Sequence, residues 1–153
     1  MNRPEFHRAG IRDDVIFGSG VKVVEPCNLY GCRVGDECFI GPFTEIQKDV
    51  VIGARTRVQS HSFICELVTI GDDCFIGHGV MFINDSFATG GPARGNKDLW
   101  RKTLIGNGVS IGSNATVLPV VITDGVVIGA GSVVTKDITE AGIYVGNPAR
   151  RLR

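Results

Sequence analysis

The sequence predicts an all-β solenoid, a parallel β-helix of six-residue repeats, on three observations. Apolar residues recur almost every six positions, small residues recur two positions before them, and glycine recurs directly after them. A fixed short period indicates that each unit repeats one backbone path and stacks on the previous unit. The fifteen apolar anchors are Val34, Ile40, Ile46, Ile52, Val58, Ile64, Ile70, Ile76, Phe82, Ile105, Ile111, Val117, Ile122, Ile128 and Val134.

The small residues indicate how each repeat is buried. Side chains two positions apart on a strand share a face, so each repeat buries one small and one larger side chain on a very short strand. In the first block the small positions hold Cys38, Thr44, Val50, Thr56, Ser62, Val68, Cys74 and Val80.

The recurrent glycines indicate corners, because a chain that bends sharply needs freedom in φ. We therefore expect each repeat to be a three-residue strand followed by a corner. These glycines are Gly35, Gly41, Gly53, Gly71, Gly77, Gly106, Gly112 and Gly129.

The period breaks in three places. Ile16, Val23 and Leu29 are candidate anchors with uneven spacing, so we expect an irregular first rung behind an N-terminal arm or cap, residues 1–14. Val117 and Ile122 are five apart, which we interpret as one shortened corner.

The largest break separates Phe82 from Ile105 and predicts a loop over residues 84–102, mostly polar, with three glycines and the only tryptophan. Loops that leave a rigid scaffold often carry function. Phe87 and Trp100 would need a surface on a neighbouring chain or a ligand.

The composition of the 153 residues fits one domain, 1–153, ending in a C-terminal segment, 138–153. A net charge of zero gives no reason to expect nucleic-acid binding. Neither a membrane-spanning apolar run nor the apolar core of a signal peptide is evident, so we expect a cytoplasmic protein. The odd total of five cysteines fits that compartment and argues against a disulfide framework.

Three segments, 70–77, 128–137 and 145–150, carry motifs that resemble those of the hexapeptide-repeat acyltransferases. The resemblance runs from about Val15 to the C-terminus. It implies a left-handed parallel β-helix with three repeats per triangular turn, a short C-terminal cap, and a homotrimer with sites between subunits.

Two of the three histidines, His61 and His78, occupy corner positions. Their anchors are 18 residues apart, so a triangular turn stacks them on successive rungs, about 4.8 Å apart. Asn84 repeats the offset of His78 one repeat later. We therefore expect His61, His78 and Asn84 to converge at the loop base, where an imidazole can accept a proton near neutral pH. A backbone hydrogen bond would be the structural alternative for His61.

Segments 79–85, 100–105 and 109–116 are similar to the subgroup that N-acetylates amino sugars carried on nucleotides. This resemblance implies that Asn84 orients the sugar amine and that Asp85 contacts substrate, although Asp85 could instead cap the loop turn. Many members place a catalytic histidine inside the loop; this loop has none, so direct attack by a neutral amine stays open.

The resemblance also implies acetyl-CoA as co-substrate, in a groove between two prisms. By position, its contacts would be Ser113, Ala130, Thr135, Lys136 and Arg150, with Arg151 or Arg153 as substitutes for Arg150. Cationic side chains suit its phosphates.

We therefore expect an acetyl-CoA-dependent N-acetyltransferase acting on a dTDP- or UDP-linked amino sugar for surface polysaccharide synthesis, without a metal. An O-acetyltransferase of a sugar or small alcohol is the first alternative. A non-enzymatic scaffold and a carbonic anhydrase-like zinc enzyme are the others. The zinc enzyme needs three histidines, and the position five after His78 holds Ile83.

Overall fold

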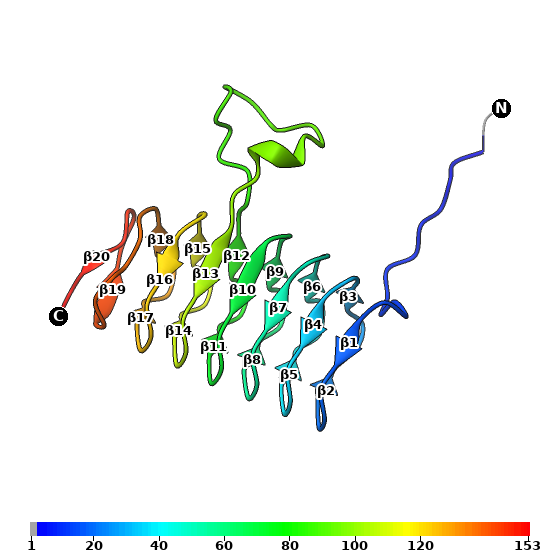
Figure 1. Ribbon diagram of the computed structural model, residues 1–153, viewed down its shortest axis with the longest axis horizontal. Coiled ribbons are helices and arrows are strands. Elements are labelled where there is room, and N and C mark those ends of the chain that lie inside the picture. Colours follow the sequence, from blue (N-terminus) through cyan, green and yellow to red (C-terminus); the bar gives the residue numbers. More distant parts are fainter. Residues whose placement is uncertain (1–2) are drawn as a thin grey trace.

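The computed structural model describes residues 3–153 and consists of short strands in three parallel sheets, wound as a triangular prism (Figure 1). Sheet 1 contains β1 (Ile16–Phe17), β4 (Arg33–Val34), β7 (Val51–Ile52), β10 (Val68–Ile70), β13 (Thr103–Ile105) and β16 (Val121–Ile122). Sheet 2 contains β2 (Lys22–Val23), β5 (Phe39–Ile40), β8 (Arg57–Val58), β11 (Phe75–Ile76), β14 (Ser110–Ile111), β17 (Val127–Ile128), β19 (Ile143–Val145) and β20 (Arg150–Arg151). Sheet 3 contains β3 (Asn28–Leu29), β6 (Glu45–Ile46), β9 (Phe63–Ile64), β12 (Met81–Phe82), β15 (Thr116–Val117) and β18 (Val133–Val134).

The chain visits sheets 1, 2 and 3 in turn, so residues about 18 positions apart stack. Ile70, for example, pairs with Ile52 on the previous rung and with Ile105 on the next rung. The predicted left-handed parallel β-helix of six-residue repeats is confirmed. We name its three long edges by the sheets that meet there: the 1–2, 2–3 and 3–1 edges.

The core forms as the period predicts. The anchors and the small residues two positions before them are buried along the whole prism; Val58, Ile64 and Val80 are fully inaccessible. Most strands contain two residues rather than the expected three, because the corner occupies the rest of each repeat. The third residue after most anchors has a positive φ, including the non-glycine residues Glu37, Asp49 and Asp73.

The glycines after the anchors have a different role from the one expected. Gly35 and Gly112 do not have positive φ. A Cβ on Gly35 would lie 2.7 Å from the backbone nitrogen of Ala54, and one on Gly112 would lie 2.4 Å from that of Ala130. Stacked rungs approach too closely for a side chain here, and the backbone freedom is needed two residues later.

The first rung is more regular than expected. Phe17, not Ile16, pairs with the anchor Val34, while Ile16 pairs with Arg33 and points outward, 53% exposed. The spacing from Phe17 to Val23 to Leu29 is therefore regular, and the five-residue step follows Leu29. That step and the one after Val117 both lie on the 3–1 edge.

The two ends of the prism differ. Residues 3–9 extend away from the body and Ile11 forms a bridge with Leu29 (Figure 1). At the other end, β20 pairs antiparallel with β19. Met1 and Asn2, part of the predicted arm, lie outside the described residues. Within residues 3–153, no helix has the length and apolar content needed to cross a bilayer.

Candidate functional site

His78 lies on the 2–3 edge, between β11 and β12. Its Nδ1 is 2.9 Å from the hydroxyl oxygen of Ser60, the corresponding corner residue of the previous rung. When Nδ1–H donates to that oxygen, the lone pair on Nε2 is available to accept a proton. Ser60 was not identified from the sequence, although its spacing of 18 from His78 is the signal that would have found it.

His61 shares the 2–3 edge with His78 on the preceding rung, as expected. Their corner positions differ, however, because Ser60 is the residue that stacks under His78. The His61 ring packs against Phe43 instead, with 4.9 Å between ring centroids and 32° between ring planes.

Asn84 lies on a different edge. It follows β12 of sheet 3 and precedes the loop that returns to β13 of sheet 1, so it belongs to the 3–1 edge. The expected convergence of His61, His78 and Asn84 within one chain is therefore wrong. Each six-residue repeat crosses one whole face of the triangle, so the same offset one repeat later falls on the next edge.

The loop leaves through an antiparallel neck. The backbone carbonyl of Asn84 accepts from the Arg101 N–H at 2.9 Å, and Asp85 forms a bridge with Trp100. The Asn84 side-chain amide donates to the carbonyl of Glu66 at 3.2 Å, which leaves its carbonyl oxygen for another partner.

Asp85 stabilises the loop from within. One carboxylate oxygen accepts from the Phe87 N–H at 3.0 Å and the other accepts from the Ala93 N–H at 2.7 Å. These contacts match the capping alternative for Asp85.

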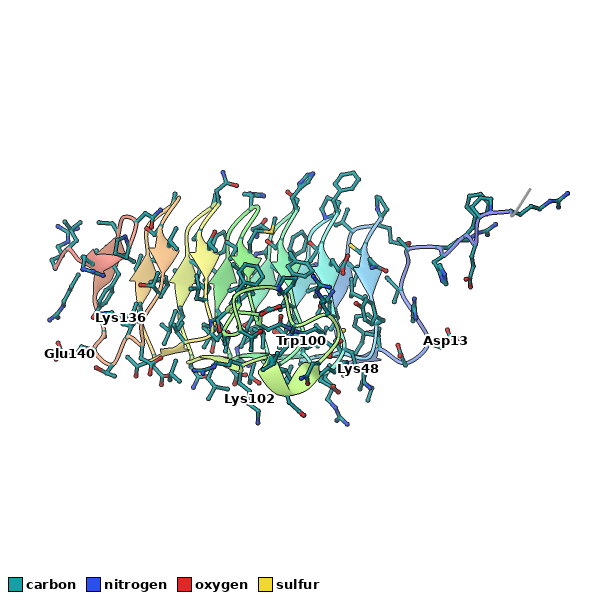
Figure 2. All side chains as sticks on the ribbon, turned by 90° about the horizontal axis from the view of Figure 1, so that it is seen from above. Asp13, Lys48, Trp100, Lys102, Lys136 and Glu140 are labelled. Atoms are coloured by element: carbon teal, nitrogen blue, oxygen red, sulfur yellow. The ribbon has the colours of Figure 1, made fainter. Side chains whose placement is uncertain are left out.

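Lys97, in the short η1 (Lys97–Leu99), attaches the loop to the prism. Its Nζ lies 2.7 Å from a carboxylate oxygen of Glu66, whose side chain is only 13% exposed, and 5.3 Å from the centre of the Trp100 ring. The hydrogen bond to Glu66 raises the pKa of Lys97. Figure 2, which looks down on the loop, labels Trp100 where the loop overlies the prism.

A hollow of about 420 Å³ lies at the loop base, lined by Gln47, Phe63, Phe82, Asn84 and Trp100 among others. Phe87 also borders it yet remains 60% exposed. The prism of the same chain therefore provides part of the surface that Phe87 and Trp100 contact.

The predicted cofactor residues divide between two places. Thr135, Lys136 and Arg150 line one hollow of about 300 Å³ at the C-terminal end of the prism, and Figure 2 labels Lys136 there. Ser113 and Ala130 lie on the 2–3 edge on the two rungs after His78, because they follow β14 and β17. A backbone hydrogen bond from Gly131 to Ser113 confirms their stacking.

Comparisons with known proteins agree with this architecture. The family described as bacterial transferase hexapeptide (six repeats) matches residues 31–66 and 102–136, and the hexapeptide repeat of succinyl-transferase matches residues 67–82. Together these matches cover more than half of the chain. The bifunctional protein GlmU of Nitratidesulfovibrio vulgaris (strain DP4) is 34% identical over 136 residues, covering 83% of this chain. The chain spans only 30% of that relative's length.

Solved structures with the same architecture include three enzymes. A mutant of AntD, an N-acyltransferase from Bacillus cereus in complex with dTDP and coenzyme A, has a TM-score of 0.79 at 24% identity, covering 90% of this chain and 81% of that one. A galactoside acetyltransferase in complex with coenzyme A has a TM-score of 0.67 at 30% identity, covering 78% and 63%. A mutant of perosamine N-acetyltransferase from Caulobacter crescentus, in complex with CoA and GDP-perosamine, has a TM-score of 0.63 at 18% identity, covering 92% and 54%.

Proposed function

The chain belongs to the bacterial hexapeptide-repeat transferase family, and we propose that it transfers an acetyl group from acetyl-CoA to the amino group of a nucleotide-linked amino sugar. The observation that carries this proposal is the row of residues on the 2–3 edge. It places an oriented imidazole, His78, directly before the two rungs that hold Ser113 and Ala130. The amine acceptor is supported by the perosamine and AntD enzymes, which carry nucleotide ligands.

The site proposed here is completed by a second subunit. His78 and Asn84 lie on the two edges that bound sheet 3. A threefold axis facing sheet 3 brings the 2–3 edge of one protomer beside the 3–1 edge of its neighbour. A homotrimer with three sites between subunits then contains a histidine and an asparagine in each site.

The outer surface of sheet 3 suits this contact. Its outward residues on the four later rungs are Phe63, Met81, Thr116 and Val133, without a charge among them, and Met81 is 41% exposed. The two earlier rungs present Asn28 and Glu45 in the same row, so the apolar contact covers the later rungs and leaves these two polar residues at its N-terminal end. Apolar surface of this kind marks a contact between proteins. Sheet 1 has an outward apolar row as well, including Leu104 and Val121, but its edges do not include His78.

The reaction needs little more than these groups. The sugar amine attacks the thioester carbonyl, and a carbon–nitrogen bond forms. Nε2 of His78 takes the proton released from the nitrogen, the carbon–sulfur bond breaks, and the proton passes to the departing CoA thiolate. Asn84, held by Glu66 through its amide group, presents its carbonyl oxygen to an N–H of the amine.

The cofactor occupies the same groove in this proposal. The pantetheine arm follows the 2–3 edge of one protomer past Ser113 and Ala130. Thr135 and Lys136 follow β18 and so lie on the 3–1 edge, which the trimer brings beside that groove, so Lys136 and Arg150 of the neighbouring protomer pair with the cofactor phosphates. The acetyl group then lies next to His78. Five free, buried cysteines fit the reducing cytoplasm, where we place the reaction.

The test is a panel of amino sugars linked to dTDP, UDP or GDP, incubated with acetyl-CoA and assayed for free thiol release. We expect release with at least one nucleotide amino sugar and none with the matching hydroxyl sugar. Release only with hydroxyl acceptors would support the alternative, an O-acetyltransferase, which the galactoside acetyltransferase likeness favours.

Two measurements address the remaining alternatives. Acetyl-CoA at 100 times its dissociation constant would stabilise an enzyme by about 2.7 kcal/mol, while a scaffold would show no shift in melting temperature. Metal analysis of the purified protein tests whether it is a zinc enzyme. Such an enzyme would need a third imidazole beside His61 and His78. The remaining histidine, His7, belongs to the N-terminal arm, residues 3–9 of which extend away from the body.

A further inference from the structure

Two aromatic rings stack on the 2–3 edge just before His78. Phe43 and His61 occupy the same corner position on successive rungs, and their ring centroids lie 4.9 Å apart. We call this pair the aromatic platform. Phe43 is 58% exposed, so about half of its surface is available to another flat group.

The fold itself does not require an aromatic ring at this position. Phe43 has a φ of 60°, in the left-handed region that is costly for bulky residues. The equivalent position at other corners of the prism has the same positive φ and holds side chains as different as Glu37, Asp73 and Leu67. Because this φ is common to the corners and does not select for aromatic residues, the observation that points to a ligand contact is the exposure of the Phe43 ring.

The surroundings of Phe43 suit a nucleobase, which has a flat apolar face and a polar edge. Phe43 borders a hollow of about 280 Å³ whose lining includes Pro26, Cys27, Asn28 and Glu45. Asn28 Oδ1 accepts from the Gly10 N–H at 3.4 Å, and one Glu45 carboxylate oxygen accepts from the Gln47 amide at 2.9 Å. The Asn28 amide N–H groups and the second Glu45 oxygen offer hydrogen-bonding groups beside an apolar floor.

The platform also lies at a suitable distance from the reacting groups. Phe43 is two rungs from His78, about 10 Å at the spacing of neighbouring strands. That distance is comparable to the length of a nucleoside diphosphate. The proposed cofactor contacts Ser113 and Ala130 lie on the opposite side of His78, so donor and acceptor would approach it from opposite ends of the edge.

We propose that the nucleobase of the acceptor's nucleoside diphosphate stacks on the aromatic platform, and that Asn28 and Glu45 contact the polar edge of this nucleobase. This inference rests on the proposed function, because it assigns part of the same substrate to named residues. Stacking on an aromatic ring contributes enough per base to change affinity about 10-fold or more.

The test compares binding of UDP, dTDP and GDP with binding of inorganic pyrophosphate, by calorimetry, in the wild-type protein and in Phe43→Leu. Leucine suits this corner, because Leu67 occupies the equivalent position with a φ of 72°. We expect the best-bound nucleoside diphosphate to lose about 10-fold in affinity in the variant, while pyrophosphate and CoA bind unchanged. Phe75→Leu, which removes an exposed ring from the flat face of sheet 2, is the matched control and should bind like the wild type.

Equal nucleotide affinity in Phe43→Leu and in the wild type, or no preference for any nucleotide over pyrophosphate, would overturn the inference. A second measurement avoids any folding defect of the variant: adding the same nucleotide to the wild-type protein should shift the NMR ring resonances of Phe43 and His61. Unshifted resonances would equally overturn it.

The platform and the proposed function fail in different ways. Nucleotide binding that depends on Phe43, without thiol release from any amino sugar, would contradict the function and leave the platform standing. Acetylation of a nucleotide amino sugar with the same KM in Phe43→Leu would contradict the platform alone.

Discussion

The pairing of Ser60 with His78 shows how a solenoid orients a reactive side chain. The hydroxyl and the ring nitrogen come from residues 18 apart, brought to 2.9 Å by the stacking of one rung on the next. This contact fixes a partner for Nδ1 within the chain itself. It would orient the imidazole that we propose as the base.

His78→Ala should distinguish the two acceptor classes. A hydroxyl must lose its proton as it attacks, so the variant should lose about 10²-fold or more in rate with an alcohol acceptor. An amine acceptor, which is partly neutral already, should lose much less. The measurement is thiol release under saturating acetyl-CoA, and full activity with the alcohol would contradict the assignment of His78 as the base.

Thr103 carries a further prediction at the residue scale. It is fully buried, and its hydroxyl has no hydrogen-bond partner within residues 3–153. Equivalent inward residues donate to the corner of the next rung, as Thr56 does to the Gly71 carbonyl at 2.9 Å. For Thr103, the corresponding corner on the next rung is the five-residue step between Val117 and Ile122. We attribute the missing acceptor to this shortened corner.

Thr103→Val should therefore stabilise the protein by about 1 kcal/mol, because a buried hydroxyl without a partner costs about that much or more. Thr56→Val is the matched control and should destabilise by about the same amount or more, since it leaves the Gly71 carbonyl and the Cys74 N–H unpaired. Chemical denaturation measures both. A destabilised Thr103→Val would show that its hydroxyl is satisfied.

At the scale of the element, the six-residue repeat has two distinct requirements in its corner. Where glycine follows the anchor, it lies against the backbone of the next rung, as Gly35 does against Ala54, and has no room for a side chain. The residue two positions later has a positive φ but faces outward, so charged residues such as Glu37 and Asp73 occupy it. Close stacking, more than turn geometry, explains the glycine pattern.

Gly35→Ala should therefore destabilise the protein by about 1–3 kcal/mol, the usual cost of overpacking, because its Cβ would lie 2.7 Å from a backbone nitrogen that cannot move alone. Gly91→Ala, in the loop, has nothing within 4 Å of its added Cβ and no positive φ, and should be neutral within about 0.5 kcal/mol. Thermal melting of the two variants measures the contrast, and equal melting temperatures would contradict it.

At the scale of the whole molecule, the prism presents rows of side chains along three faces, and the proposed site depends on which face meets a neighbour. Met81→Glu places a charge in the outward row of sheet 3 and should convert the proposed trimer to monomers, with loss of the proposed acetyl transfer. Leu104→Glu, on sheet 1, should leave the trimer intact. Light scattering after size exclusion measures both, and dissociation by Leu104→Glu alone would identify sheet 1 as the interface.

The thiols report on the integrity of the prism. Burial raises the pKa of Cys32 to about 11 and that of Cys65 to about 12. All five cysteines should thus be unreactive toward a disulfide reagent at about pH 8 in the native protein and react fully in denaturant. Because the pKa values of these thiols are raised in the folded state, the buried neutral thiols contribute fully to the free energy of unfolding below the ordinary thiol pKa. This contribution is lost as the pH rises towards about 11–12. Rapid labelling of native protein would contradict the buried placement.

The sequence alone determined the solenoid, its inward residues and the position of the loop, because a six-residue period records burial and corner geometry locally. It misplaced the anchor of the first rung, choosing Ile16 over Phe17, since two adjacent apolar residues give no local sign of which one points inward. The separation of His78 and Asn84 onto different edges, and the packing of Phe43 on His61, were decided only by the tertiary structure. Both features depend on how much of a triangular turn each repeat completes and on which corner residues stack between rungs. Neither property can be inferred from the sequence of a single repeat.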